Sequence, residues 1–166
     1  MLARQHPVEA DLVIGVPESG IDAASATAGI GHSLRQRICE EQLCGPHLHP
    51  ACQGQRENSV RLKLNVLATA VKGKRVVMLD DSIVRGTTAA RIVKMLKDAG
   101  ATEVHVRISS PPFRWPCYFG TDVPERSQLS AVRYSVEEIR QQLSADSLGY
   151  LDLSTLERCS AATTFH

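Results

Sequence analysis

Residues 75–88 read R-V-V-M-L-D-D-S-I-V-R-G-T-T. Val76 to Leu79 form a short apolar run, which predicts a buried strand, and the run leads directly into two adjacent carboxylates, Asp80 and Asp81. Like charges in contact raise each other's pKa and cost stability unless a cation or hydroxyl donors accompany them. The sequence therefore predicts a ligand at the end of this strand.

The segments on either side predict an α/β fold. The short apolar run at 11–16 (D-L-V-I-G-V) predicts a first strand that ends in a turn, and 103–108 (E-V-H-V-R-I) predicts a third strand. The apolar spacing of 88–99 predicts a helix between the second and third strands, and 136–143 predicts another helix. Strand, helix and strand with short connections predict a βαβ unit, and hence a parallel sheet flanked by helices.

The loop after Asp81 has the composition of a phosphate-binding loop. Ligands of parallel α/β sheets lie beyond the carboxyl ends of the strands, and a helix N-terminus there favours an anion. A phosphate next to two carboxylates suggests a phosphorylated sugar, whose hydroxyls or Mg²⁺ would meet the carboxylates. The first strand's loop, with Ser19 and Gly20, is expected to hold a second anionic group. The hydroxyl and unhindered N–H donors of the second loop are Ser82, Gly86, Thr87 and Thr88.

A structural alternative exists for the same loop. Ser, Gly and Thr after a strand also compose an ordinary solvated turn, in which Asp81 would be the N-cap of the following helix. A lone D-D-S would not separate the two interpretations, but the full run from Val76 to Thr88 favours a binding loop.

Composition excludes several classes of protein. The 166 residues are enough for one domain, and 19 basic against 18 acidic residues give no reason to propose nucleic acid as a partner. No apolar run approaches the length of a membrane span, so no membrane is expected either. Five cysteines, none in a C-x-x-C pair, predict a reduced cytoplasmic protein. The central group of cysteines and histidines matches no usual zinc spacing: Cys39, Cys44, Cys52, His47 and His49.

The run V-V-M-L-D-D-S-I-V-R-G-T-T resembles the phosphoribosyl pyrophosphate (PRPP) motif of type I phosphoribosyltransferases. The version with S-I-V-R-G-T-T is similar to glutamine PRPP amidotransferases of purine synthesis, as are A-D-L-V-I-G-V-P-E-S-G-I, W-P-C-Y-F-G and A-D-S-L-G-Y-L. The resemblance covers residues 10–30 and 56–156. It implies the type I phosphoribosyltransferase fold, with a phosphoribosyltransferase domain over 1–156 and an unstructured tail at 157–166.

The resemblance also implies a binding site for PRPP and Mg²⁺. Asp80 and Asp81 would hold the ribose hydroxyls and Mg²⁺. The pyrophosphate would bind at Pro17, Glu18, Ser19 and Gly20, with Ser19 near the metal. No catalytic side chain is identified. The 5′-phosphate loop implied by the family comprises Ser82, Ile83, Val84, Arg85, Gly86, Thr87 and Thr88.

The reaction implied is displacement of pyrophosphate from the ribose C1 by ammonia, which gives 5-phosphoribosylamine. It requires positioning, neutralisation of the leaving group and exclusion of water. Two alternatives stay open: a PRPP-binding or structural module without turnover, and a phosphoribosyltransferase acting on a nucleobase. The second would need a base-binding hood, for which no candidate segment is found.

Two departures from the family concern partners and cofactors. The family's glutaminase domain is not in this sequence, so the nitrogen is expected to come from ammonia or a separate glutaminase. Cys117 falls where some members place one of four ligands of an iron–sulfur cluster; a lone thiolate cannot hold such a cluster, so we expect a relic position. Members of the family are homo-oligomeric.

The third departure is residues 31–55, where the family has a lid of the form K-N-x-Y-V-G-R-T-F. Synonymous codons exist for Gly31–His49 that, read one base later, encode G-T-P-Y-G-N-G-F-V-K-N-S-Y-V-G-R-T-F. We therefore predict a frame slip near residues 25–31 that is restored near 50–56, and an aberrant segment in place of the lid. Because such lids exclude water and grip the leaving group, we expect catalysis to be impaired.

Overall fold

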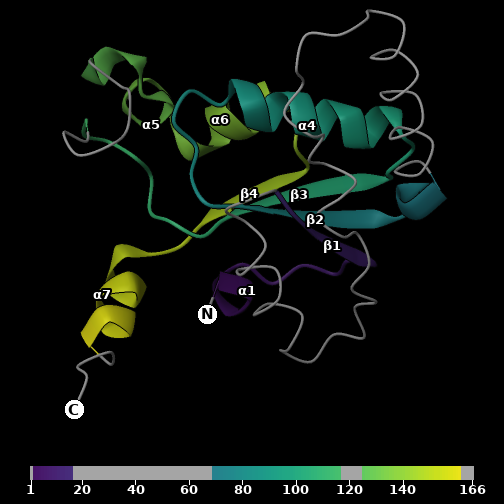
Figure 1. Ribbon diagram of the computed structural model, residues 1–166, viewed down its shortest axis with the longest axis horizontal. Helices are drawn as coiled ribbons and strands as arrows, with labels where there is room; N and C mark the ends of the chain where they lie inside the picture. Colours follow the sequence, from purple (N-terminus) through teal and green to yellow (C-terminus); the bar gives the residue numbers. More distant parts are fainter. Residues whose placement is uncertain (1, 17–68, 117–124, 162–166) are drawn as a thin grey trace, which may run out of the picture.

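The centre of the structure is a sheet of four parallel strands, in the order β1-β2-β3-β4 (Figure 1). The computed structural model describes residues 2–16, 69–116 and 125–161. The three strands predicted from sequence are confirmed, and the expected parallel α/β sheet with them. The strands are β1 (Leu12–Gly15), β2 (Arg75–Asp80), β3 (Glu103–Ile108) and β4 (Ser147–Tyr150).

The helices α4 and α6 lie on one face of this sheet, and the short α1 lies on the other (Figure 1). The predicted helices at 88–99 and 136–143 are confirmed as α4 (Thr87–Asp98), displaced by one residue, and α6 (Val136–Leu143). Ser135 begins α6 with a capping box, in which its hydroxyl and Glu138 satisfy each other's backbone N–H groups. The shorter elements are α1 (Leu2–Gln5), η1 (Arg126–Gln128) and α5 (Ser130–Arg133).

Alternation along β2 divides the apolar core between the two faces. Val76 and Met78 point toward α4 and belong to the larger cluster, with Val93 and Leu96 of that helix. Val77 and Leu79 point the other way and pack with Leu2 of α1 in a smaller cluster. A strand buried on both sides explains the continuous apolar run in the sequence.

Two elements near the carboxyl end of the chain differ from the sequence predictions. β4 was not predicted, because Ser147 to Tyr150 is short and contains Gly149, whereas pairing with β3 makes it a strand. The prediction that residues 157–166 form an unstructured tail is wrong for 157–161, which belong to α7 (Leu153–Ala161). The side chain of Gln5 in α1 holds the start of α7 through bonds to Asp152 and Thr155, a tertiary contact that local sequence does not reveal.

A polar network covers part of the α1 face of the sheet. Arg107 of β3, 5% exposed, donates from Nε to the His6 carbonyl at 3.3 Å and from Nη1 to Ser147 Oγ at 2.8 Å. His105 lies 2.9 Å from Ser147 Oγ through Nδ1 and 2.9 Å from Glu103 Oε2 through Nε2. Since arginine is only a donor, the Ser147 hydroxyl accepts from it and can donate its own proton to Nδ1 of a neutral His105. This network joins β3, β4 and the segment after α1.

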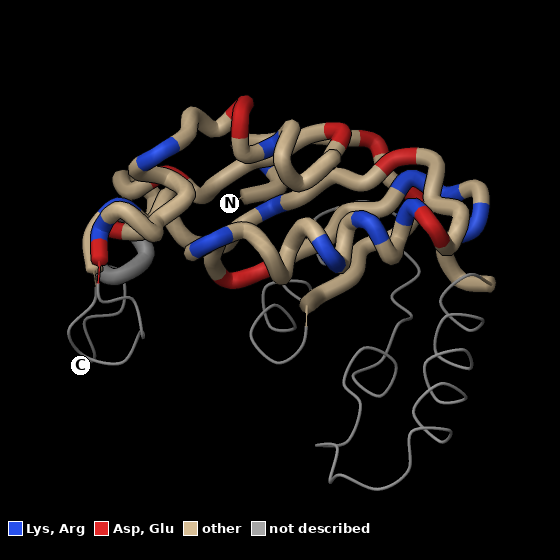
Figure 2. Tube along the Cα trace, turned by 90° about the horizontal axis from the view of Figure 1, so that it is seen from above, with Lys and Arg blue, Asp and Glu red and all other residues tan. Residues whose placement is uncertain are grey.

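Charged residues of both signs are interspersed along the described chain (Figure 2). None of the helices in residues 2–16, 69–116 and 125–161 combines the length and the apolar character that crossing a bilayer requires.

Candidate functional site

The two adjacent carboxylates lie at the carboxyl end of β2. Asp80 is the last residue of the strand, in register with Ile108, and its side chain faces α4 and is only 7% exposed. Asp81 is exposed, and its backbone N–H donates to Asp80 Oδ1 at 2.9 Å. Burial, followed by the side-chain hydrogen bond with Asp81 and the charge of Asp81, raises the pKa of Asp80 to about 6, and the bond from the Asp81 backbone N–H offsets only part of this rise. Without a ligand, ionisation of this carboxyl therefore opposes folding.

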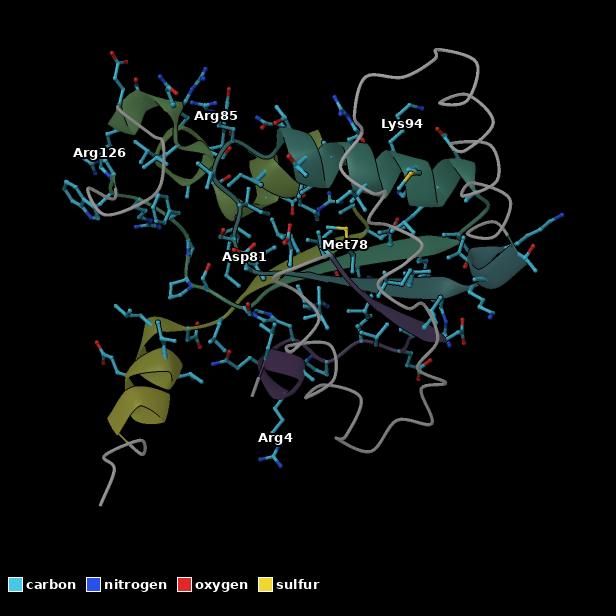
Figure 3. All side chains as sticks on the ribbon, in the orientation of Figure 1. Arg4, Met78, Asp81, Arg85, Lys94 and Arg126 are labelled. Carbon is cyan, nitrogen blue, oxygen red and sulfur yellow. The ribbon has the colours of Figure 1, made fainter. Side chains whose placement is uncertain are left out.

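The loop from Asp81 to Gly86 is anchored at both sides. Ile83 is buried in the larger core cluster. The Val84 carbonyl accepts from the backbone N–H of Ser130 at 2.8 Å, and Arg85 Nη2 donates to Gln128 Oε1 at 2.5 Å. These contacts come from η1 and α5, which follow β3 in the sequence. Figure 3 shows Asp81 at the end of the sheet and Arg85 on the path from there to α4.

Gly86 sets the geometry at the start of α4. It is the N-cap residue with φ 79, a left-handed conformation that strains any residue with a Cβ atom. The interpretation of Asp81 as N-cap is wrong, because the helix begins at Thr87 and no side chain caps it. The first intrahelical bond runs from Ala90 N to the Gly86 carbonyl at 2.9 Å. The N–H groups of the preceding turn are thus available to an anion, next to the exposed side chains of Thr87 and Thr88.

The structure places further polar groups near this edge that sequence reasoning missed. Ser109 donates to the Asp80 carbonyl from its backbone N–H at 2.9 Å and from its hydroxyl at 3.3 Å. The Ser110 Oγ and Tyr150 hydroxyl are buried without a hydrogen-bond partner among the described residues, and burial raises the pKa of Tyr150 to about 12. Ser109 and Ser110 directly follow the third predicted strand, so their position was a usable signal. Tyr150 gave none, because β4 was not predicted.

The donor set fits magnesium held jointly with a substrate. No group of three or more metal-ligating side chains is found in the described ranges. Asp80 and Asp81 supply two carboxylates, one of them buried beside the other. Mg²⁺ commonly takes one or two protein carboxylates and completes its shell with water and substrate phosphates. A cation here would also stabilise the ionised form of Asp80, whose pKa is raised mainly by burial and further by Asp81.

Several predicted residues lie outside the described part of the chain. These are the predicted pyrophosphate loop, Pro17 to Gly20, the aberrant segment 31–55, the cysteines and histidines within that segment, and Cys117. The described part of the predicted site, Asp80 to Thr88, forms one continuous strand–loop–helix unit.

Comparison with known proteins identifies close relatives. No family model matches the chain. An amidophosphoribosyltransferase of Archaeoglobus fulgidus is 51% identical over 157 residues, which are 94% of this chain and 34% of that protein. The corresponding protein of Bacillus subtilis is 50% identical over 159 residues, 94% of this chain and 33% of its own.

Solved structures agree with these relatives. The glutamine PRPP amidotransferase of B. subtilis, complexed with ADP and GMP, superposes with a TM-score of 0.71 at 49% identity, covering 95% of this chain and 35% of the other. A structure described as the allosteric regulatory enzyme of purine biosynthesis superposes with a TM-score of 0.68 at 45% identity, covering 95% and 34%. The predicted type I phosphoribosyltransferase fold is therefore confirmed. The chain spans about a third of the length of the curated relatives it matches, and over that shared third it is homologous to amidophosphoribosyltransferases.

Proposed function

We propose that this chain binds PRPP with Mg²⁺ and carries the phosphoribosyltransferase part of an amidophosphoribosyltransferase of de novo purine biosynthesis. The observation that carries the proposal is the buried Asp80 beside Asp81, joined by a short loop to an uncapped helix N-terminus. A carboxylate pair and an anion site on one loop match the two ends of a ribose 5-phosphate group. The family relationship supports the same substrate.

Each part of the loop has a proposed role. Asp80 and Asp81 accept hydrogen bonds from the ribose hydroxyls and hold Mg²⁺, and the segment from Ser82 to Thr88 binds the 5′-phosphate. Pro17 to Gly20 bind the pyrophosphate, with Ser19 near the metal. When bound, Mg²⁺ neutralises charge on the phosphate oxygens and so helps pyrophosphate to leave.

The proposed reaction is attack of ammonia on the ribose C1, with loss of pyrophosphate and formation of 5-phosphoribosylamine. The nitrogen comes from free ammonia or from a separate glutaminase. The residues named here bind and orient PRPP, and none acts as a nucleophile. We propose that Cys117 is a relic position that does not hold an iron–sulfur cluster, and that the protein forms homo-oligomers. Its cytoplasmic location stays a prediction.

We further propose that residues 31–55 result from the frame slip, and that turnover is impaired because the sequence there lacks the family's lid motif. A lid acts mainly in the transition state, so PRPP binding survives its loss better than catalysis does. A second candidate, a PRPP-binding module without turnover, is favoured by the same missing motif. Replacing Gly31–His49 with G-T-P-Y-G-N-G-F-V-K-N-S-Y-V-G-R-T-F-I separates them, because only the first predicts restored ammonia-dependent turnover.

The binding proposal is tested by thermal unfolding with PRPP and Mg²⁺. Ligand at about 100 times its Kd should raise the free energy of unfolding by about 3 kcal/mol. Asp80→Ala combined with Asp81→Ala should abolish this gain, while the control Asp98→Ala, at the far end of α4, should keep it. A gain that survives the double substitution would refute the assignment.

A further inference from the structure

The loop that precedes α4 is held by η1 and the start of α5, a segment that follows β3 in the chain. Two successive loop residues are held: the Val84 carbonyl by the Ser130 N–H at 2.8 Å, and the Arg85 side chain by Gln128 Oε1. Ser130 is buried, and its Oγ lies 3.6 Å from where a Cβ atom on Gly86 would be. The segment therefore follows the loop from Val84 to the N-cap of α4.

This segment is itself anchored to the chain that leaves β3. The Arg126 guanidinium lies 3.9 Å from the centre of the Trp115 ring, and its Nε donates to the Arg114 carbonyl at 3.2 Å. Leu129, between the two loop contacts, is fully buried. The short helix η1 therefore contacts the chain near Trp115 through Arg126 and contacts Arg85 through Gln128 (Figure 3 labels Arg85 and Arg126).

The hydrogen bond from the Arg85 side chain to Gln128 contributes little to the stability of the fold. Arg85 is exposed, so its charge needs no partner to remain in the fold, and exposed polar contacts of this kind contribute little to stability. The bond does restrict a long side chain that would otherwise rotate freely beside the uncapped start of α4. Guanidinium has five N–H donors, and of those in Arg85 the structure shows one used within the described residues.

We propose that Gln128 is a positioning residue for the 5′-phosphate: it holds Arg85 so that the remaining guanidinium donors and the Gly86 turn are ordered before the ligand arrives. Ordering a cation in advance reduces the entropy lost on binding. This inference rests on the proposed function, because it assumes that a 5′-phosphate occupies the loop. It adds Gln128, which lies 43 positions further along the chain than Arg85 and which the motif alone does not indicate.

The test measures Kd by titration calorimetry for two probes, ribose 5-phosphate and pyrophosphate, each with Mg²⁺. Gln128→Ala should weaken the binding of ribose 5-phosphate about five- to tenfold, the size expected when one long side chain must be ordered on binding. Pyrophosphate should be unaffected, since it is assigned to the other loop. Gln128→Met, which keeps the length of the side chain but lacks the acceptor oxygen, should weaken ribose 5-phosphate binding to the same extent as Gln128→Ala. The melting temperature should stay unchanged. Ser127→Ala is the matched control, because the Ser127 hydroxyl donates to Glu125 Oε2 and not to Arg85.

A double-mutant cycle shows whether Gln128 acts through Arg85. In the Arg85→Ala background, Gln128→Ala should have no further effect on the Kd of ribose 5-phosphate. An additive effect, equal weakening of both probes, or tighter binding by Gln128→Ala would each overturn the inference while leaving the proposed function standing. Failure of the unaltered chain to bind either probe or PRPP would overturn both.

Discussion

Two ionisable side chains are buried on opposite faces of the same sheet, and their surroundings differ. Arg107, on the α1 face, is 5% exposed and donates to two backbone carbonyls and to Ser147 Oγ. Asp80, on the α4 face, is 7% exposed, and its carboxylate accepts from the backbone N–H of Asp81, whose own carboxylate repels it. The fold satisfies the first group internally and leaves the second in need of a cation or donor. Burial of an ionisable side chain therefore does not by itself indicate a functional group. Burial without enough hydrogen bonds or opposite charge to stabilise the ionised form does.

The largest effect should follow from removing the charge of Asp80. The folded protein holds the Asp80 proton up to a pKa of about 6, against 3.8 for the ordinary group. The stability associated with that proton is therefore present below pH 3.8 and is lost as pH rises through about 6. The difference corresponds to on the order of 3 kcal/mol. Asp80→Asn should be more stable than the unaltered chain by this order at pH 8 and equal to it at pH 3.5, while losing PRPP binding.

Urea unfolding at several pH values, in buffer without divalent cations, measures this difference. Asp98→Asn, an exposed carboxyl on α4, is the control and should show no comparable change. Equal stability of Asp80→Asn and the unaltered chain at pH 8 would mean that the fold itself stabilises the Asp80 carboxylate. The proposed difference between Asp80 and Arg107 would then be wrong.

A smaller effect is expected at Gly149, where the Arg107 network meets the segment after α1. A Cβ atom there would lie 2.5 Å from His6 Cγ, so the ring must move. His6 Nε2 lies 2.8 Å from the Tyr150 carbonyl, and the His6 carbonyl accepts from Arg107. Gly149→Ala should therefore lower the free energy of unfolding by about 2 kcal/mol.

Denaturant unfolding of Gly149→Ala, alone and combined with His6→Ala, provides the measurement. The combination removes the overlap, so the cost of the added methyl group should largely vanish in the His6→Ala background. Fully additive losses would show that contact with His6 is not the reason for glycine at this position.

The smallest effect is expected for Ser147→Ala, which removes one acceptor from Arg107 and one partner from His105. The loss should be about 1 kcal/mol, typical of a buried hydrogen bond. PRPP affinity should not change, because the network lies on the face opposite Asp80. Calorimetric titration with PRPP and an unfolding curve of this variant provide the two measurements. Reduced PRPP affinity with unchanged stability would contradict the assignment of a structural role to the α1 face and of ligand binding to the α4 face.

Much of the fold could be predicted because its signals are local. The apolar run before Asp80, the helical spacing after Gly86 and the alternation of Glu103–Ile108 each reflect burial that neighbouring residues reveal. β4 and α7 could not be predicted in this way. Ser147–Tyr150 becomes a strand through pairing with β3, and the start of α7 is held by Gln5 from the opposite end of the chain. Both depend on contacts between residues distant in sequence.

In the candidate site too, some features follow from contiguous sequence and others from contacts between distant residues. The sequence by itself determined the carboxylate pair, the loop of hydroxyls and glycine, and the family that they resemble, because strand, loop and helix are contiguous. Only the tertiary structure decided that Asp80 is buried while Asp81 is exposed, and that Gly86 rather than Asp81 is the N-cap of α4. It also decided that Gln128 and Ser130 hold the loop. The physical reason is that burial, and with it the raised pKa of Asp80, arises from helices and strands packed around the motif, and these come from other parts of the chain.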